Sequence, residues 1–305
     1  MTAARVLFVF LDGVGLGSDD PATNPVAAAA TPFIESLLGA KLTAAAEPLT
    51  RPGLVYRRLA TTLGVDGLPQ SATGQTTLLT GVNAAAVMGR HYGPWPGPTL
   101  LRLIEERGTL FTEAARFGGA VLANAYPPAY LAAMSGAPGG RRQRPNAPTF
   151  AAMAAGLELR DLNDYRVGGA AAADLSGERF AEMDPSLAPH GAAGTAAALL
   201  GLAAGAAFTF FDVWPTDALG HAKDFAGATR LLTLLDEVLA RLVGQDVTLV
   251  VTSDHGNLED LDSAQHTYAE VPLLVTGPRA EAFAGATSLL DVAPAIRAVW
   301  GDAGG

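Results

Sequence analysis

The sequence contains no cysteine and only two lysines, and each shortage excludes a class of site. Without thiols the chain can form neither disulfides nor thiolate zinc sites, and it has no cysteine nucleophile. Its 20 basic residues against 30 acidic ones leave a net charge of −10. This balance argues against nucleic-acid binding, because that function needs a basic face. A small anionic ligand would need a local source of positive charge, such as metal cations or a few arginines.

Charge is sparse along the whole chain, and one long uncharged stretch resembles a membrane span. Charged residues make up 16% of the sequence, and residues 192–211 carry none over about the 20 residues that a span requires. Three glycines weaken this stretch, and Gly205 divides it, so we expect a buried helix followed by a buried strand. The apolar run at 5–11 ends too early for a signal peptide, which favours a cytoplasmic protein without membrane contact.

Apolar runs without helical spacing alternate with helical segments along the chain. This alternation predicts an α/β fold with a doubly wound, mainly parallel sheet and helices on both faces. The predicted strands lie at residues 5–11, 120–123, 206–214, 247–253 and 271–275. Apolar spacing and capping residues predict helices at 31–38, with Thr31 as its cap, and at 99–117, 225–243 and 291–300.

The texture of the sequence changes between residues 126 and 190. This interval is rich in proline and glycine and lacks a strong apolar period. It also contains Arg141, Arg142 and Arg144, the densest positive cluster, which we interpret as a solvated loop. We expect a metal-binding α/β core made of residues 1–125 and 191–305, with residues 126–190 forming a small insertion or lid.

Acids and histidines stand where predicted strands end. Asp12 follows the run at 5–11, and Asp254 with His255 follows the run at 247–253. Ligands of open α/β sheets bind outside the carboxyl ends of the strands, so these side chains are placed where a site is expected. Asp217 and His221 are four positions apart and would share one face of a helical turn.

Two further residues complete the candidate set. His266 precedes the last predicted strand, and Ser71 lies at the start of a predicted helix, where free N–H groups favour an anion. Taken singly, each candidate has a more ordinary role as a cap or loop residue. Together, six carboxylate and imidazole ligands suit zinc, manganese or iron, and they suit two ions better than one.

The order of these residues resembles the alkaline phosphatase superfamily, and within it the cofactor-independent phosphoglycerate mutase and phosphopentomutase branch. The similar segments are FLDGVG, QSATGQ, DALGHAKDF, TSDHGN and QHTYAEVPLL. The resemblance implies two divalent metal ions, manganese or zinc, and a small phosphorylated substrate. The implied ligands of one ion are Asp12, Ser71, Asp254 and His255, and those of the other are Asp217, His221 and His266. Ser71 would also be the nucleophile that accepts a phosphoryl group.

Two departures from that branch affect the expected reaction. Its mutases usually have histidine where this chain has Gln75, and their large cap occupies an interval that here also holds core elements. A mutase must hold its substrate during reorientation, whereas a hydrolase needs only to admit water. We therefore expect a phosphatase or phosphodiesterase acting on a small phosphate ester. A phosphomutase and a non-catalytic metal-binding protein are the alternatives, and the oligomeric state stays open.

Overall fold

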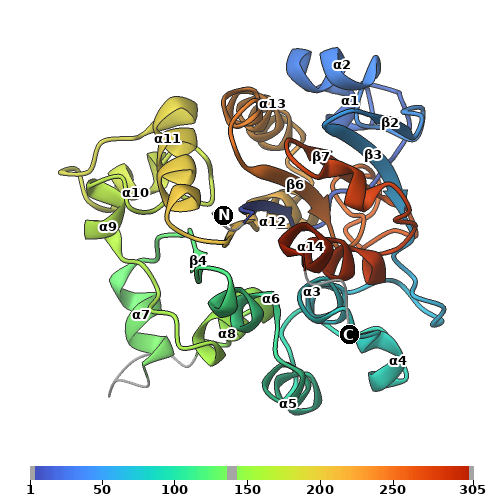
Figure 1. Ribbon diagram of the computed structural model, residues 1–305. Helices are drawn as coiled ribbons and strands as arrows, with labels where there is room; N and C mark the ends of the chain where they lie inside the picture. Colours follow the sequence, from blue (N-terminus) through green and yellow to red (C-terminus); the bar gives the residue numbers. More distant parts are fainter. Residues whose placement is uncertain (1–3, 136–142, 302–305) are drawn as a thin grey trace.

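The computed structural model describes residues 4–135 and 143–301, and its centre is a seven-stranded sheet (Figure 1). The strands follow the order β2-β3-β7-β6-β1-β5-β4, in which β6, β1, β5 and β4 are parallel neighbours. The pairs β6–β7, β7–β3 and β3–β2 are antiparallel, so five of the seven strands run in one direction. The mainly parallel sheet is thus confirmed. The strands are β1 (Val6–Leu11), β2 (Leu49–Arg51), β3 (Leu54–Leu59), β4 (Ala120–Leu122), β5 (Phe208–Val213), β6 (Thr248–Ser253) and β7 (Val271–Thr276).

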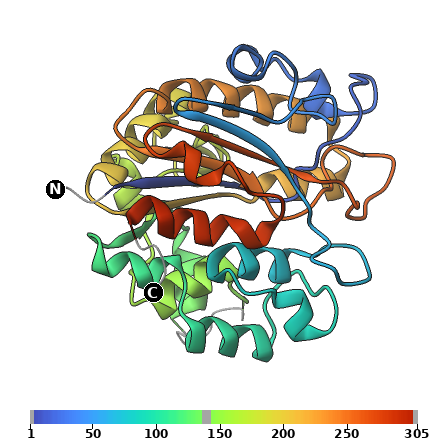
Figure 2. The same cartoon turned by 45° about the vertical axis from the view of Figure 1, so that its right-hand side comes forward.

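Helices cover both faces of the sheet (Figure 2). On one face the layer consists of α1 (Pro25–Ala28), α2 (Pro32–Leu38), α11 (Gly191–Ala204) and α13 (Phe225–Leu242). On the other face it consists of α3 (Ser71–Thr80), α4 (Ala84–Met88), α5 (Pro98–Arg107), α6 (Leu110–Glu113), α8 (Ala147–Ala154) and α14 (Val292–Trp300). Short 3-10 helices at Ala114–Arg116, Ala280–Phe283 and Leu289–Asp291 and the helix α12 (Pro215–Ala222) link these elements.

The central strand β1 explains why the sheet needs two layers. Its residues are fully buried, and they alternate between two separate hydrophobic cores. Phe8 and Phe10 face the layer of α3 and α14, whereas Leu7 and Val9 face the layer of α11 and α13. A strand that buries both faces reads as a continuous apolar run, which is why the sequence predicted it directly.

Residues 126–190 form helices and no strand of the sheet within their described part. These helices are α7 (Pro128–Met134), α8, α9 (Leu162–Arg166) and α10 (Glu178–Met183). Helix α8 packs into the main core, whereas Tyr165, Phe180 and Leu187 belong to a small core of their own. The division into a core of 1–125 and 191–305 with a lid of 126–190 stays a prediction. Arg141 and Arg142 lie outside the described residues.

The single helix predicted over 99–117 is wrong. Helix α5 ends at Arg107 because Gly108 adopts a positive φ of 70°. Thr109 then begins α6 with a capping box shared with Thr112. The apolar spacing continues across this turn and therefore indicated one helix, whereas the turn depends on the single glycine at position 108.

The start of α2 is capped from another helix rather than by Thr31, whose side chain makes no capping bond. The carboxylate of Asp236 in α13 accepts hydrogen bonds from the backbone N–H groups of Phe33 and Ile34 at 3.0 and 2.8 Å. Asp236 is buried, so this contact joins α2 to α13 inside the protein.

We expect Asp236→Ala to lower the free energy of unfolding by about 2 kcal/mol, because it leaves two backbone donors without an acceptor. Urea unfolding measures this loss. Glu237→Ala, on the exposed face of the same helix, serves as the control and should change stability by less than about 0.5 kcal/mol. Equal effects of the two substitutions would contradict the capping role.

Candidate metal centre

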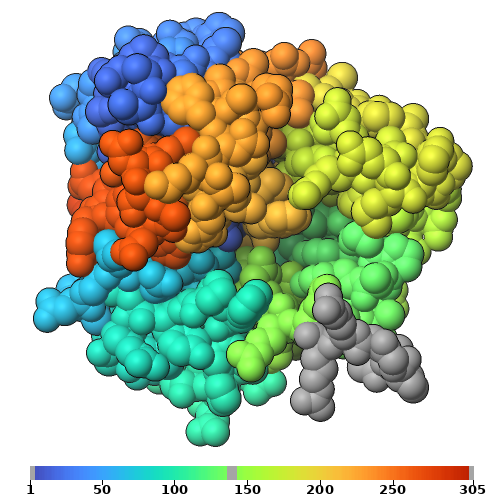
Figure 3. Space-filling view, turned by 180° about the vertical axis from the view of Figure 1, so that it is seen from behind, coloured from blue at the N-terminus to red at the C-terminus, as the bar shows by residue number. Residues whose placement is uncertain are grey.

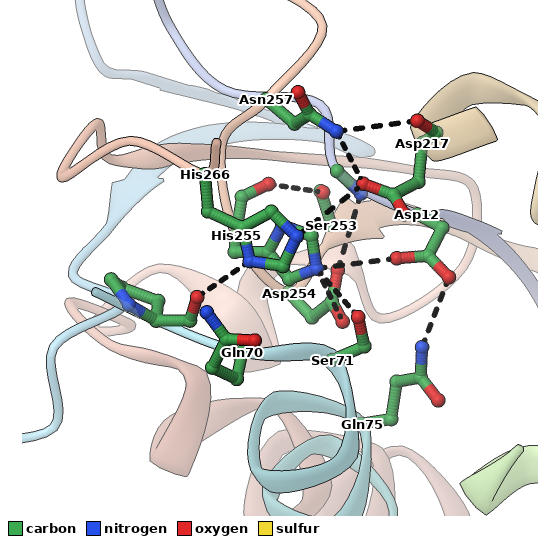
Figure 4. Close-up of polar contacts among 12 residues, drawn as sticks. Asp12, Gln70, Ser71, Gln75, Asp217, Ser253, Asp254, His255, Asn257 and His266 are labelled. Carbon is green, nitrogen blue, oxygen red and sulfur yellow. Dashed lines mark hydrogen bonds and ion pairs between the residues drawn. The ribbon is translucent and has the colours of Figure 1, made fainter. Parts of the chain in front are cut away.

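The carboxyl ends of three neighbouring strands meet at one place. Strands β6, β1 and β5 are adjacent and parallel, so the residues that follow them lie at the same edge of the sheet. Asp12 follows β1, Asp254 follows β6, and α12 with Asp217 follows β5. The structure gathers all seven predicted site residues at this edge, and Figure 4 shows most of them.

The first group consists of Asp12, Asp254 and His255, with Ser71 beside them. One ligand atom from each of the three lies within 4.8 Å of the others. His255 Nε2 is 3.4 Å from Asp12 Oδ1 and 3.5 Å from Asp254 Oδ2. The Ser71 hydroxyl is 2.9 Å from the same nitrogen, and all four side chains are buried (Figure 4). Two carboxylates, an imidazole and a hydroxyl thus converge.

The second group consists of Asp217, His221 and His266, and it is more exposed than the first. His221 Nε2 lies 3.3 Å from Asp217 Oδ2 and 3.3 Å from His266 Nε2. His266 Nε2 is 3.7 Å from the other Asp217 oxygen. The rings of His255 and His266 stack with centroids 3.8 Å apart, which brings the two groups side by side.

The outer nitrogens of the second group's histidines fix which nitrogen faces inward. His221 Nδ1 lies 2.8 Å from the Ala264 carbonyl oxygen, and His266 Nδ1 lies 2.8 Å from that of Pro69. A carbonyl oxygen can only accept a hydrogen bond, so each Nδ1 carries the hydrogen and each Nε2 presents a lone pair. This arrangement is typical of histidines that bind metals.

Burial and repulsion make the two inner carboxylates costly to ionise. The pKa of Asp12 is raised well above its ordinary value, chiefly by burial and then by the charge of Asp217. The pKa of Asp254 is raised in the same way, by burial and then by Asp12 and Asp217. A positive charge between these groups would reverse both effects.

The residues fit a metal ion by their donor chemistry and by their unpaired atoms. Asp12 Oδ1 and Asp254 Oδ2 are buried and have no hydrogen-bond partner among residues 4–135 and 143–301, although buried polar atoms are almost always paired. Burial also lowers the pKa of the His255 imidazole, and burial together with His255 lowers that of His266 to about 4. Neutral imidazoles and orphaned carboxylate oxygens are the ligands that a divalent cation requires.

Ser71 is brought to the site by helix α3, of which it is the first residue. Gly74 allows this approach, because a Cβ at that position would lie 2.8 Å from the Cβ of Asp254. The QSATGQ segment therefore needs glycine at this position for packing.

Sequence analysis missed the support that three polar residues give to the site. Gln75 donates its amide to Asp12 Oδ2 at 3.1 Å, and Asn257 donates to Asp217 Oδ1 at 2.6 Å (Figure 4). Asp212, near the end of β5, is buried beside the same cleft with one unpaired oxygen. An acid close to the end of a predicted strand was a visible signal for Asp212. No local pattern reveals the other two contacts.

Comparison with known proteins agrees with this geometry. The Metalloenzyme superfamily model matches residues 188–299. The 2,3-bisphosphoglycerate-independent phosphoglycerate mutase of Desulforudis audaxviator is 38% identical over 94 residues, or 26% of this chain and 18% of that protein. The phosphopentomutase of Pectobacterium atrosepticum is 30% identical over 90 residues, or 28% of this chain and 22% of that protein. Each match thus spans about a fifth of the relative's length.

Solved structures show the fold over nearly the whole chain. Alkaline phosphatase from the Antarctic bacterium TAB5 has a TM-score of 0.56 at 14% identity, with 98% of both chains covered. Cold-active alkaline phosphatase from Shewanella sp. has a TM-score of 0.55 at 12% identity, covering 96% of this chain and 99% of that one. The chain has the fold of the alkaline phosphatases, and its residues 188–299 match the Metalloenzyme superfamily model. The resemblance carried by its sequence segments is thus supported by a family model over part of the chain and by the fold over nearly all of it.

We expect Mn²⁺ or Zn²⁺ to stabilise the metal-free protein, since ligands that bind only the folded state add about 2.7 kcal/mol at a hundredfold excess over Kd. Thermal unfolding with and without metal measures the shift. Asp254→Asn and Asp217→Asn should each reduce it, because each removes a negatively charged ligand. Glu106→Gln, exposed on α5, is the control. A metal shift of the same size in all four proteins would contradict the ligand assignment.

A pH-dependent prediction concerns Asp212, whose pKa burial raises to about 8, with repulsion from Asp12 adding to the effect. The folded protein keeps Asp212 protonated up to about pH 8, whereas the unfolded chain releases this proton at pH ~3.9. The free energy of unfolding therefore falls as the pH rises toward 8. Asp212→Asn should remove up to about 1.4 kcal/mol of that decline per pH unit. Urea unfolding of metal-free protein between pH 5.5 and 7.5 tests this slope. The exposed Asp66→Asn should keep the wild-type slope, and an unchanged slope in Asp212→Asn would refute the assignment.

Proposed function

We propose that this protein is a metal-dependent phosphatase or phosphodiesterase that uses Ser71 as its nucleophile and two divalent ions. The position of Ser71 carries the proposal. Its hydroxyl lies 2.9 Å from His255 Nε2, at the N-terminus of α3 and beside the candidate metal ligands. We propose a small phosphate ester as the substrate, rather than nucleic acid or a membrane surface, because the chain has a net charge of −10.

The proposed reaction forms and then cleaves a phosphoserine. Bound divalent ions would lower the pKa of the Ser71 hydroxyl and neutralise charge on the phosphoryl oxygens. The Ser71 oxygen bonds to phosphorus while the bond from phosphorus to the ester oxygen breaks. The departing alcohol takes up a proton through water, which balances the proton that Ser71 loses. A water molecule then cleaves the phosphoserine, releasing phosphate and restoring the hydroxyl.

A phosphomutase is the second candidate, and the names of the matched relatives favour it. In that reaction the phosphoserine would return its phosphoryl group to another hydroxyl of the substrate. The residue at position 75 favours hydrolysis over this transfer. This residue stands where such mutases usually have histidine, and its amide binds Asp12. A metal-binding protein without catalysis is the third candidate.

In the presence of Mn²⁺ or Zn²⁺, Ser71→Ala should lower the rate of phosphate release at least about a thousandfold, because the nucleophile is lost. Release of inorganic phosphate from a panel of phosphate esters measures it. Ser36→Ala, exposed on α2, is the matched control and should retain wild-type rates. Full activity in Ser71→Ala would overturn the proposal.

The same samples separate the three candidates. A hydrolase releases free phosphate. A mutase moves the phosphoryl group between substrate positions without releasing free phosphate. Both the hydrolase and the mutase form phosphoserine at residue 71. Bound metal with no turnover on any ester and no phosphoserine would support the non-catalytic alternative.

A further inference from the structure

The metal centre lies in a cleft of about 910 Å³. Figure 3 shows this hollow where the teal, green and orange parts of the chain meet. Asp12, Ser71 and Asp217 line it together with side chains from α7, α10 and α12. Small-molecule pockets range over roughly 300–1,000 Å³, so the cleft has room for much more than a phosphoryl group.

Large apolar side chains that stay exposed gather along this cleft. Trp95, Met183 and Trp214 are 48%, 56% and 41% exposed, and all three line it. They come from three separate segments: the loop before α5, the end of α10 and the residue before α12. Single exposed apolar residues are ordinary, but a group of them around one concave site indicates a surface that binds an apolar ligand.

The aromatic residues of the cleft offer flat faces and a positive charge. The guanidinium carbon of Arg179 lies 5.8 Å from the centre of the Trp214 ring. Tyr126 and Tyr130 stack with centroids 4.7 Å apart and an angle of 13° between their planes. Flat π systems and guanidinium groups favour a planar aromatic partner, which can stack on both.

Several polar groups of the cleft are already engaged within the protein. The Thr149 hydroxyl lies 3.1 Å from that of Tyr126, and the Asn146 amide donates to Asp212 at 2.7 Å. The Asp174 carboxylate accepts from two backbone N–H groups at the start of α10. Recognition of a sugar rests on polar groups that are free to pair with its hydroxyls. Thr149, Asn146 and Asp174 are thus engaged, whereas one oxygen of Gln75 and one of Asp212 stay unpaired among the described residues that line the cleft.

We propose that the substrate is a phosphate ester whose alcohol part carries a planar aromatic ring, and that Trp95 and Trp214 bind this ring. The inference rests on the proposed function, because it assigns the substrate class of the same site. It differs from the sugar and glycerate phosphates that the names of the relatives suggest.

The test compares three esters of primary alcohols: 2-phenylethyl phosphate, 2-cyclohexylethyl phosphate and glycerol 1-phosphate. Their bonds to phosphorus have similar intrinsic reactivity, so differences in kcat/KM report recognition of the alcohol part. With metal-loaded enzyme, we expect the phenyl ester to exceed the glycerol ester by at least about tenfold. We expect the cyclohexyl ester to fall between them. Equal values for the phenyl and cyclohexyl esters would reduce the preference to general apolarity and overturn the aromatic assignment.

Variants locate the preference. Trp214→Ala and Trp95→Ala should each lower the ratio of kcat/KM for the phenyl ester to that for the glycerol ester by about tenfold. Val167→Ala changes an apolar residue that is 80% exposed outside the cleft, and it should leave the ratio unchanged. An unchanged ratio in both tryptophan variants would refute their role, and if only one of them folds, an unchanged ratio in that variant refutes the role of the residue it replaces.

A binding measurement separates this inference from the proposed function. In Ser71→Ala, 2-phenylethylphosphonate should quench the fluorescence of Trp95 and Trp214, whereas the third tryptophan, Trp300, is buried on α14. Saturable quenching without turnover of any ester in the wild type would keep the aromatic site and refute the hydrolase. Turnover of all three esters without preference or quenching would refute the aromatic site and keep the hydrolase.

Discussion

The crowding of carboxylates at the ends of buried strands is the constraint on which the rest of the structure depends. The register pairs Leu11 of β1 with Val213 of β5 and with Ser253 of β6, so the three strands end at the same level. The residues that follow therefore include Asp12 and Asp254, which repel each other in a medium that does not solvate them. A bound cation would offset this repulsion and lower both pKa values again.

The surrounding structure holds these charges in place. Two hydrophobic cores fix the strands from both faces, and hydrogen bonds from Gln75 and Asn257 orient the carboxylates of Asp12 and Asp217. Gly74 lets α3 approach closely enough to bring Ser71 beside His255. The candidate ligands, Ser71 and the supporting amides thus depend on rigid elements, which is what a metal site needs to keep its geometry.

The sequence predicted the central strands and the positions of Asp12 and Asp254 for the same physical reason. A strand buried on both faces leaves a continuous apolar run, and an acid directly after it stands out. Three features were not predicted: the end of helix α5 at Gly108, the capping of α2 by Asp236, and the hydrogen bond between Asn146 and Asp212. The break hides inside unbroken apolar spacing. The other two join residues far apart in the chain, and periodicity reports only local order.

The low lysine content of the chain and the apolar walls of its cleft are both explained if bound cations supply the positive charge of the site. Where bound cations supply the positive charge for a phosphoryl group, the site needs no lysine, and the walls around it are free to be apolar. The candidate ligands Asp12 and Asp254 directly follow strands, whereas Trp95 and Met183 lie in segments between strands. Segments between strands vary more easily than buried strands, because fewer contacts constrain them. In the proposed reaction, chemistry and selectivity would therefore rest on different parts of the fold, and a likeness to phosphomutases over part of the chain does not determine which alcohol the walls of the cleft would bind.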